Sequence, residues 1–143
     1  MKNCLPIILF LAAICFTACQ KDKGSGTLPA GTWNVVSDST YSGVGPIASA
    51  NVYTGQPGDY FKFSGNTLSI KEGTRRVATA TYTQVNDTLE LSYNNLEENG
   101  EAITATGTAK YIITSQTSTS MKLMADPFLS PGGIYEEYIT LSR

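Results

Sequence analysis

The sequence predicts an all-β protein, an eight-stranded antiparallel up-and-down barrel preceded by a cleaved signal peptide. From residue 28 onward, apolar and polar residues alternate in short runs rich in Thr, Val, Ile and Tyr, which is the period of β-strands. Short turns join most of these runs, and charged residues make up only 15% of the chain. Eight strands connected in this way can pair the last strand with the first and leave no open edge. A sandwich of two sheets built from the same strands is the alternative fold.

The first predicted strand covers residues 32–41. Trp33 and Val35 lie on one face of it and polar neighbours lie on the other, as expected for a strand with one buried side. Residues 42–58 are rich in Gly, Pro, Ser and Ala and predict a long loop. A short edge segment is expected within that loop at residues 50–54.

Tight turns join the next three predicted strands. These strands are expected over residues 59–64, 67–71 and 75–83. Phe61 and Phe63 share one face of the second strand, and Leu68 and Ile70 share one face of the third. We expect Tyr82 to point inward from the fourth. The sequence at residues 65–66 (Gly-Asn) suits a hairpin turn, because both residues accept a positive φ.

The remaining strands are expected over residues 88–93, 106–115, 120–125 and 134–141. Apolar side chains again alternate along them: Leu89 and Leu91, Tyr111 and Ile113, Met121 and Leu123, Ile139 and Leu141. Residues 94–105 are polar and acidic and predict a loop, as does the Pro- and Gly-containing segment 126–133.

The N-terminus has the pattern of an export signal. Lys2 precedes an unbroken apolar run over residues 5–16, which is shorter than the roughly 20 residues that span a bilayer. Cys19 directly follows a small residue, which resembles the lipobox of bacterial lipoproteins. The expected domains are a lipoprotein signal peptide (1–18), a lipidated flexible tether (19–27) and the barrel (28–143). An ordinary secretory signal with an incidental cysteine is the alternative.

The resemblance to lipoproteins also implies a location. Cleavage before Cys19 would leave that residue as the acylated N-terminus and the membrane anchor, since several acyl chains hold a protein stably at a bilayer. Gln20 at the next position resembles a signal for the outer membrane. Residues 20–22 resemble the start of the signal that exports lipoproteins of Bacteroidota to the cell surface. The same residues also suit a plain polar tether.

Composition narrows the classes of function. The chain has no histidine, which excludes a Ser-His-Asp triad and a histidine-bound metal. Its net charge of −2 gives no reason to expect nucleic-acid binding. Two acid pairs occur, at residues 97–98 and 136–137. The two neighbours in each pair point to opposite faces of a strand, and we expect both pairs to be solvated surface charges. We therefore predict no enzyme, no cofactor and no metal site.

Gly31, Thr32 and Trp33 open the first strand of this meander with a Gly-x-Trp motif, which resembles the lipocalins. Residues 28–143 as a whole resemble the lipocalin-like lipoproteins of Bacteroidota, through residues 28–37, 58–63, 111–115 and 121–123. The resemblance implies that Trp33 closes one end of the barrel beside an arginine past the last strand, a part that Arg143 suits. The Thr-Asp-Tyr motif typical of lipocalins is missing, and residues 116–119 stand in its place.

Two functions are compatible with this chain. In the first, a lipid-anchored envelope protein holds a small hydrophobic ligand inside the barrel. The candidate interior residues are Trp33, Phe61, Phe63, Tyr82 and Tyr111, which would equally well form an ordinary core. In the second, a surface module contacts an envelope protein or a glycan through its long loops.

Overall fold

The described residues of the computed structural model form β-strands joined by turns and include no helix. The structure describes residues 28, 30–44, 49–103, 107–126, 128–130 and 133–143. The predicted signal peptide and tether, with Cys19, lie outside the described residues. Among the described residues there is accordingly no helix with the length and hydrophobicity of a membrane span. The strands are β1 (Gly31–Gly43), β2 (Ser49–Thr54), β3 (Tyr60–Ser64), β4 (Thr67–Glu72), β5 (Arg76–Val85), β6 (Thr88–Glu98), β7 (Glu101–Ala102), β8 (Thr108–Gln116), β9 (Ser120–Ala125), β10 (Phe128–Ser130) and β11 (Gly133–Ser142).

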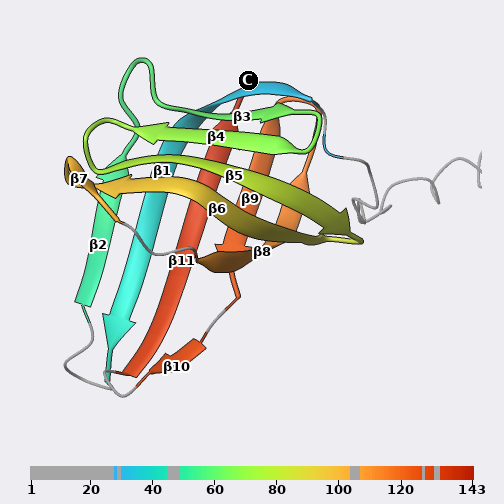
Figure 1. The fold of residues 1–143 in the computed structure, drawn as a ribbon. Helices are drawn as coiled ribbons and strands as arrows, with labels where there is room; N and C mark the ends of the chain where they lie inside the picture. The colour runs from blue at the N-terminus through green and yellow to red at the C-terminus, as the bar shows by residue number, and fades with distance from the viewer. Residues whose placement is uncertain (1–27, 29, 45–48, 104–106, 127, 131–132) are drawn as a thin grey trace, which may run out of the picture.

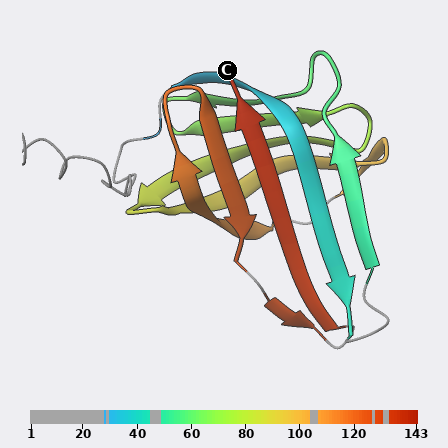
Figure 2. The same ribbon diagram turned by 180° about the vertical axis from the view of Figure 1, so that it is seen from behind.

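Eight of these strands close into an antiparallel barrel. They pair in the order β1, β3, β4, β5, β6, β8, β9 and β11, and β11 pairs back onto β1 with Val35 opposite Leu141 and Tyr41 opposite Glu136. Figures 1 and 2 show β3 to β6 crossing over the long strands β1 and β11. The predicted eight-stranded barrel is confirmed, and the closing pair of strands excludes the open sandwich.

Three further strands lie outside the ring. β2 pairs with the second half of β1, whose first half pairs with β3, so the edge segment expected within the long loop is confirmed. The prediction of a loop at residues 94–105 is wrong for its first half, because β6 continues to Glu98 and a turn then leads into β7. Within the loop expected at residues 126–133, β10 pairs with β11. Together β1, β2, β10 and β11 extend past the rest of the barrel (Figures 1 and 2).

Large apolar side chains fill the interior of the barrel. The buried core residues include Trp33, Phe61, Phe63, Leu68, Ile70, Leu89, Leu91, Met121, Leu123, Ile139 and Leu141, each at most 2% exposed. They come from every strand of the ring except β5 and β8, which contribute Ala78, Ala80, Tyr111 and Ile113. Alternating inward positions therefore pack one continuous apolar core, as in small barrels generally.

Arg143 closes one end of this core. Its guanidinium carbon lies 4.3 Å from the centre of the Trp33 ring, and its Nη2 donates a 2.6 Å hydrogen bond to the carbonyl of Ala30. Gly31 has a φ of +125°, and a Cβ there would come within 3.2 Å of Arg143. The glycine of the motif therefore leaves room for the arginine, and the expected contact between Arg143 and Trp33 is present.

A β-bulge at Val36 changes which residues of β1 point inward. The register with β11 shifts between Val35 and Ser37, so Val36 is the extra residue. Trp33 and Val35 point inward before the bulge, whereas Asp38, which is fully buried, points inward after it. Because one inserted residue exchanges the two faces of a strand, the second half of β1 turns its polar residues toward the interior.

Asp59 holds the connection between β2 and β3 against the turn between β4 and β5. One carboxylate oxygen accepts hydrogen bonds from the Tyr53 hydroxyl at 2.6 Å and the Gln56 amide at 2.7 Å. The other accepts the Gly73 amide at 2.7 Å. Burial raises the pKa of Asp59, but these hydrogen bonds and the positive charge of Lys71 together lower it by more than burial raises it. The net effect is a pKa below the ordinary value, so the native barrel favours the ionised carboxylate.

We expect the substitution Asp59→Asn to lower the free energy of unfolding by about 1–3 kcal/mol at neutral pH, because the amide cannot accept at both positions. A lowered native pKa adds stability above about pH 4 and loses it as the pH falls further. The difference from wild type should therefore shrink in acid, as measured by urea unfolding at pH values of about 7 and about 3. The exposed Asp87→Asn is the control, and an equal loss in both variants would contradict this role.

Candidate functional site

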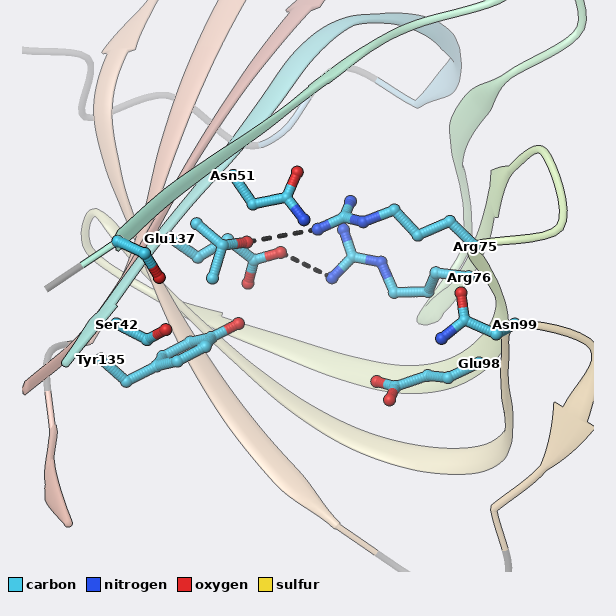
Figure 3. Close-up of a pocket in the computed structure, with 10 residues that line it drawn as sticks. Ser42, Asn51, Arg75, Arg76, Glu98, Asn99, Tyr135 and Glu137 are labelled. Atoms are coloured by element: carbon cyan, nitrogen blue, oxygen red, sulfur yellow. Dashed lines mark hydrogen bonds and ion pairs between the residues drawn. The ribbon is translucent and has the colours of Figure 1, made fainter. Parts of the chain in front are cut away.

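Two adjoining cavities open at the end of the barrel where β5 begins. Their volumes are about 560 and 410 Å³. Both are lined by Arg76 from β5, Glu98 at the end of β6, and Tyr135 and Glu137 from β11. Figure 3 shows the first cavity, with Arg76 and Glu98 on one wall and Tyr135 and Glu137 on the other. Volumes of this size are typical of small-molecule sites.

The two cavities differ in polarity. The walls of the first are completed by polar side chains, namely Thr40, Ser42, Ser49, Asn51, Arg75 and Asn99. The second contains more apolar surface, from Tyr93, Leu96, Ala109 and Ala125. A ligand that spans both would therefore meet a charged end and an apolar end.

Arg76 is the centre of a buried charged cluster that forms part of these walls. Its Nε lies 2.9 Å from Glu72, its Nη1 lies 2.8 Å from Glu137, and its Nη2 lies 3.0 Å from Asp38. Nη1 also donates to the Tyr111 hydroxyl at 3.3 Å, and that hydroxyl donates to Glu137 at 2.8 Å. One guanidinium thus links β5 to β1, β4, β8 and β11 across the interior of the barrel.

Arg75 adds a second positive charge that is more exposed than that of Arg76. Its Nη1 lies 2.6 Å from Asp38 and 3.0 Å from Glu72, and its Nη2 donates to Thr40. One oxygen of each of these two carboxylates, Asp38 Oδ1 and Glu72 Oε1, is buried without a hydrogen-bond partner among the described residues. The cluster thus has more acceptor capacity than its own donors use.

Three carboxylates and two guanidiniums leave this cluster one negative charge in excess when every group is ionised. Glu137 relieves the imbalance, because burial and the neighbouring Asp38 raise its pKa to about 7 against the opposing effect of Arg76. Burial likewise raises the pKa of Glu72, and it raises the pKa of Tyr111 well above the usual range. The proton count of the cluster therefore changes close to neutral pH, mainly at Glu137.

We expect this proton to make the stability of the barrel depend on pH. The pKa of Glu137 is about 7 in the native state and about 4.3 in the unfolded state. Its proton therefore stabilises the native state fully below a pH of about 4.3, and this stabilisation is lost as the pH rises to about 7. Glu137→Gln removes the titration, so its free energy of unfolding should fall less between pH values of about 5 and about 7.5 than that of wild type. Urea unfolding measures both, with Glu136→Gln as the matched control. Parallel curves for wild type and Glu137→Gln would contradict the prediction.

The five aromatic residues predicted for the interior do point inward, but they divide between two surroundings. Trp33, Phe61 and Phe63 belong to the packed core and line neither of the two cavities. Tyr82 packs edge-on against Phe63 at 5.5 Å and donates to the carbonyl of Gly65. Tyr111 alone among the five lines the second cavity. The structure thus brings only one of these residues to the candidate site.

The charged residues of the site were not among the candidates from the sequence. Glu137 was expected to be solvated, yet it is 3% exposed, while its neighbour Glu136 lies on the other face. The alternation of side chains along β4 does indicate that Glu72 points inward, because Glu72 lies on the same face of the strand as Leu68 and Ile70. In the described part of the chain, no group of three or more Asp, Glu, Cys or His side chains is arranged so that it could hold a metal ion.

Comparison with known proteins adds no relative. No protein-family model, no curated protein and no solved structure matches this chain. Fold and site together therefore define its class: a closed eight-stranded β-barrel with an apolar core and a charged cavity at one end.

Proposed function

We propose that this protein is a lipocalin-like, lipid-anchored binding protein of the bacterial cell envelope. It holds a small ligand with an apolar body and a polar group, rather than catalysing a reaction. The observation that supports the proposal most directly is the pair of adjoining cavities at the open end of the barrel, where the packed core gives way to the charged cluster. The lipobox-like Cys19 and the contact between Arg143 and Trp33 support the anchor and the lipocalin-like class.

The shape of the site suits an amphipathic ligand. Tyr93, Leu96 and Ala109 offer the apolar body a surface in the second cavity, and Glu137 with Arg76 offers hydrogen bonds to the polar group. A few polar groups in an otherwise apolar pocket commonly fix the orientation of a bound molecule. The sequence predicts a small hydrophobic ligand, and the polar residues of the site favour one that also carries a polar group at one end.

Native mass spectrometry of the protein released gently from its own membranes tests ligand binding. The wild type should carry a small molecule, and Ala109→Phe, which fills the second cavity, should lose it. Ala50→Phe, on the exposed face of β2, should retain it. Wild-type protein without a bound molecule, or equal retention by both variants, would argue against the proposal.

The anchor and its location need a separate experiment. Metabolic labelling with a fatty acid should label the wild type and leave Cys19→Ser unlabelled, because the cysteine carries the acyl chains in this proposal. Protease added to intact cells should remove the barrel if the protein lies on the cell surface. An unlabelled wild type would refute the lipid anchor, and a fully protected barrel would refute the surface location.

A second candidate function is an interaction with an envelope protein or a glycan. Exposed apolar side chains on the outer face of β1, β2 and β11 favour it: Tyr41 (39% exposed), Val52 (63%) and Tyr138 (45%). Val52 and Tyr138 both lie opposite Ser39 in the sheet, and Tyr41 is two residues further along the same strand as Ser39, so the three side chains lie on one face. Crosslinking on intact cells should give a defined adduct that Val52→Ser abolishes and Val85→Ser, an exposed valine elsewhere, preserves. Equal adducts from both variants would remove this candidate.

A further inference from the structure

The charge around the two cavities identifies the kind of polar group that fits. Four carboxylates lie on or directly behind the first cavity, Asp38, Glu72, Glu98 and Glu137, against the two guanidiniums of Arg75 and Arg76. The second cavity adds Lys110 and Asp126, whose charges cancel. The fully ionised site therefore carries an excess of two negative charges.

The two guanidiniums are poorly placed to receive an anion. Arg75 is paired with Asp38 and Glu72, and Arg76 is paired with Asp38, Glu72 and Glu137, all at 3.0 Å or less. An anionic ligand would have to displace one of these buried carboxylates, and a buried charge that loses its partner is costly. A cationic ligand needs no such displacement.

Aromatic residues line the two cavities beside the cluster. Tyr135 lines both cavities beside Glu137, and Tyr93 and Tyr111 line the second. The faces of such rings attract cations, and a carboxylate next to aromatic rings is a common arrangement for recognising ammonium groups. The unpartnered oxygens Asp38 Oδ1 and Glu72 Oε1 add negative potential behind this wall.

Resting on the proposed function, we propose that the polar group of the ligand is an amine or quaternary ammonium. It binds at the junction of the two cavities, between Glu137 and the ring of Tyr135 on one wall and Glu98 on the other. Figure 3 shows Glu98 and Tyr135 reaching toward this space from opposite walls. The apolar body of the ligand then lies along Tyr93, Leu96 and Ala109 in the second cavity.

Binding of a cation at this point is coupled to the proton on Glu137. The groups that interact with Glu137 are Asp38 from β1, Arg76 from β5, Tyr93 from β6, Tyr111 from β8 and Tyr135 on its own strand, and Arg76 also binds Glu72 from β4. A positive charge beside the carboxylate favours its ionised form. Binding therefore expels the proton that Glu137 otherwise holds below neutral pH, and affinity rises with pH across neutrality.

Isothermal titration of the purified protein with three probes of one chain length tests the charge preference. The probes are octyltrimethylammonium, octanoate and octanol, which differ in the charge of the head group. We expect the ammonium to bind about tenfold more tightly than either of the others. If octanoate or octanol binds as tightly, this inference fails while the proposed function stands. If none of the three binds, the proposed function fails as well.

Variants then locate the ammonium group. Glu137→Gln and the rim variant Glu98→Gln should each weaken ammonium binding about tenfold or more, and Glu136→Gln, on the outer face, should not. The wild-type affinity for octyltrimethylammonium, whose charge does not titrate, should rise between pH values of about 6 and about 8, and this rise should be absent in Glu137→Gln. Unchanged affinity in both Glu137→Gln and Glu98→Gln would overturn the assignment.

Discussion

Arg76→Met is expected to lower the free energy of unfolding by about 3–5 kcal/mol at neutral pH, a large fraction of the stability of a small domain. The side chain is only 10% exposed and is the shared partner of Asp38, Glu72 and Glu137. Methionine fills similar space but leaves these carboxylates without their central counter-charge. Urea unfolding followed by circular dichroism measures the loss.

Two comparisons distinguish loss of charge from loss of packing. Arg75→Met should cost less, because that side chain is 30% exposed and Arg76 continues to neutralise the same carboxylates. The loss in Arg76→Met should also be smaller at a pH of about 5, since the pKa values of Glu72 and Glu137 are raised and protonation removes uncompensated charge. A loss that is independent of pH and equal in the two variants would show that charge is not its cause.

Trp33→Ala should be the most damaging change at the opposite end of the barrel, at about 3–5 kcal/mol. Trp33 is fully buried, so truncation leaves a cavity that the surrounding strands cannot fill. It also removes the ring over which Arg143 lies. The free energy of unfolding from urea titration, with the midpoint of thermal unfolding as a second measure, tests the prediction.

Arg143 provides the matched comparison. Arg143→Ala should cost about 1 kcal/mol, as expected for an exposed cation over an aromatic ring. Because the two side chains touch, the double variant should lose less than the sum of the single losses. Strictly additive losses would mean that the contact between Arg143 and Trp33 contributes nothing to stability.

Much of the barrel could be predicted from local pattern. Alternation placed Trp33, Phe61 and Phe63 in the interior, and short turns implied neighbouring antiparallel strands. The extension of β6 through two asparagines and two glutamates could not be predicted in the same way. Those residues have low strand propensity, and pairing with the start of β5, Arg76 opposite Glu98, holds them in the sheet.

The candidate site was predictable only in part. Strict alternation places Glu72, Arg76 and Glu137 inward. A charged side chain is rarely buried without a partner, however, and here the partners come from distant strands, which the local sequence does not reveal. Asp38 could not be predicted by alternation at all. The bulge at Val36 reverses the faces of β1, and nothing in the local residue types specifies an inserted position.

The strand β5 also shows where the N-terminal end of the barrel lies relative to the cavity. The Leu28 amide donates to Gln84 near the end of β5, whereas Arg76 begins that strand beside the cavity, roughly 26 Å away for an extended chain. If Cys19 carries the proposed lipid, the chain that follows it therefore enters the barrel at the end remote from the cavity, so the attachment point and the opening for the ligand lie at opposite ends of the barrel.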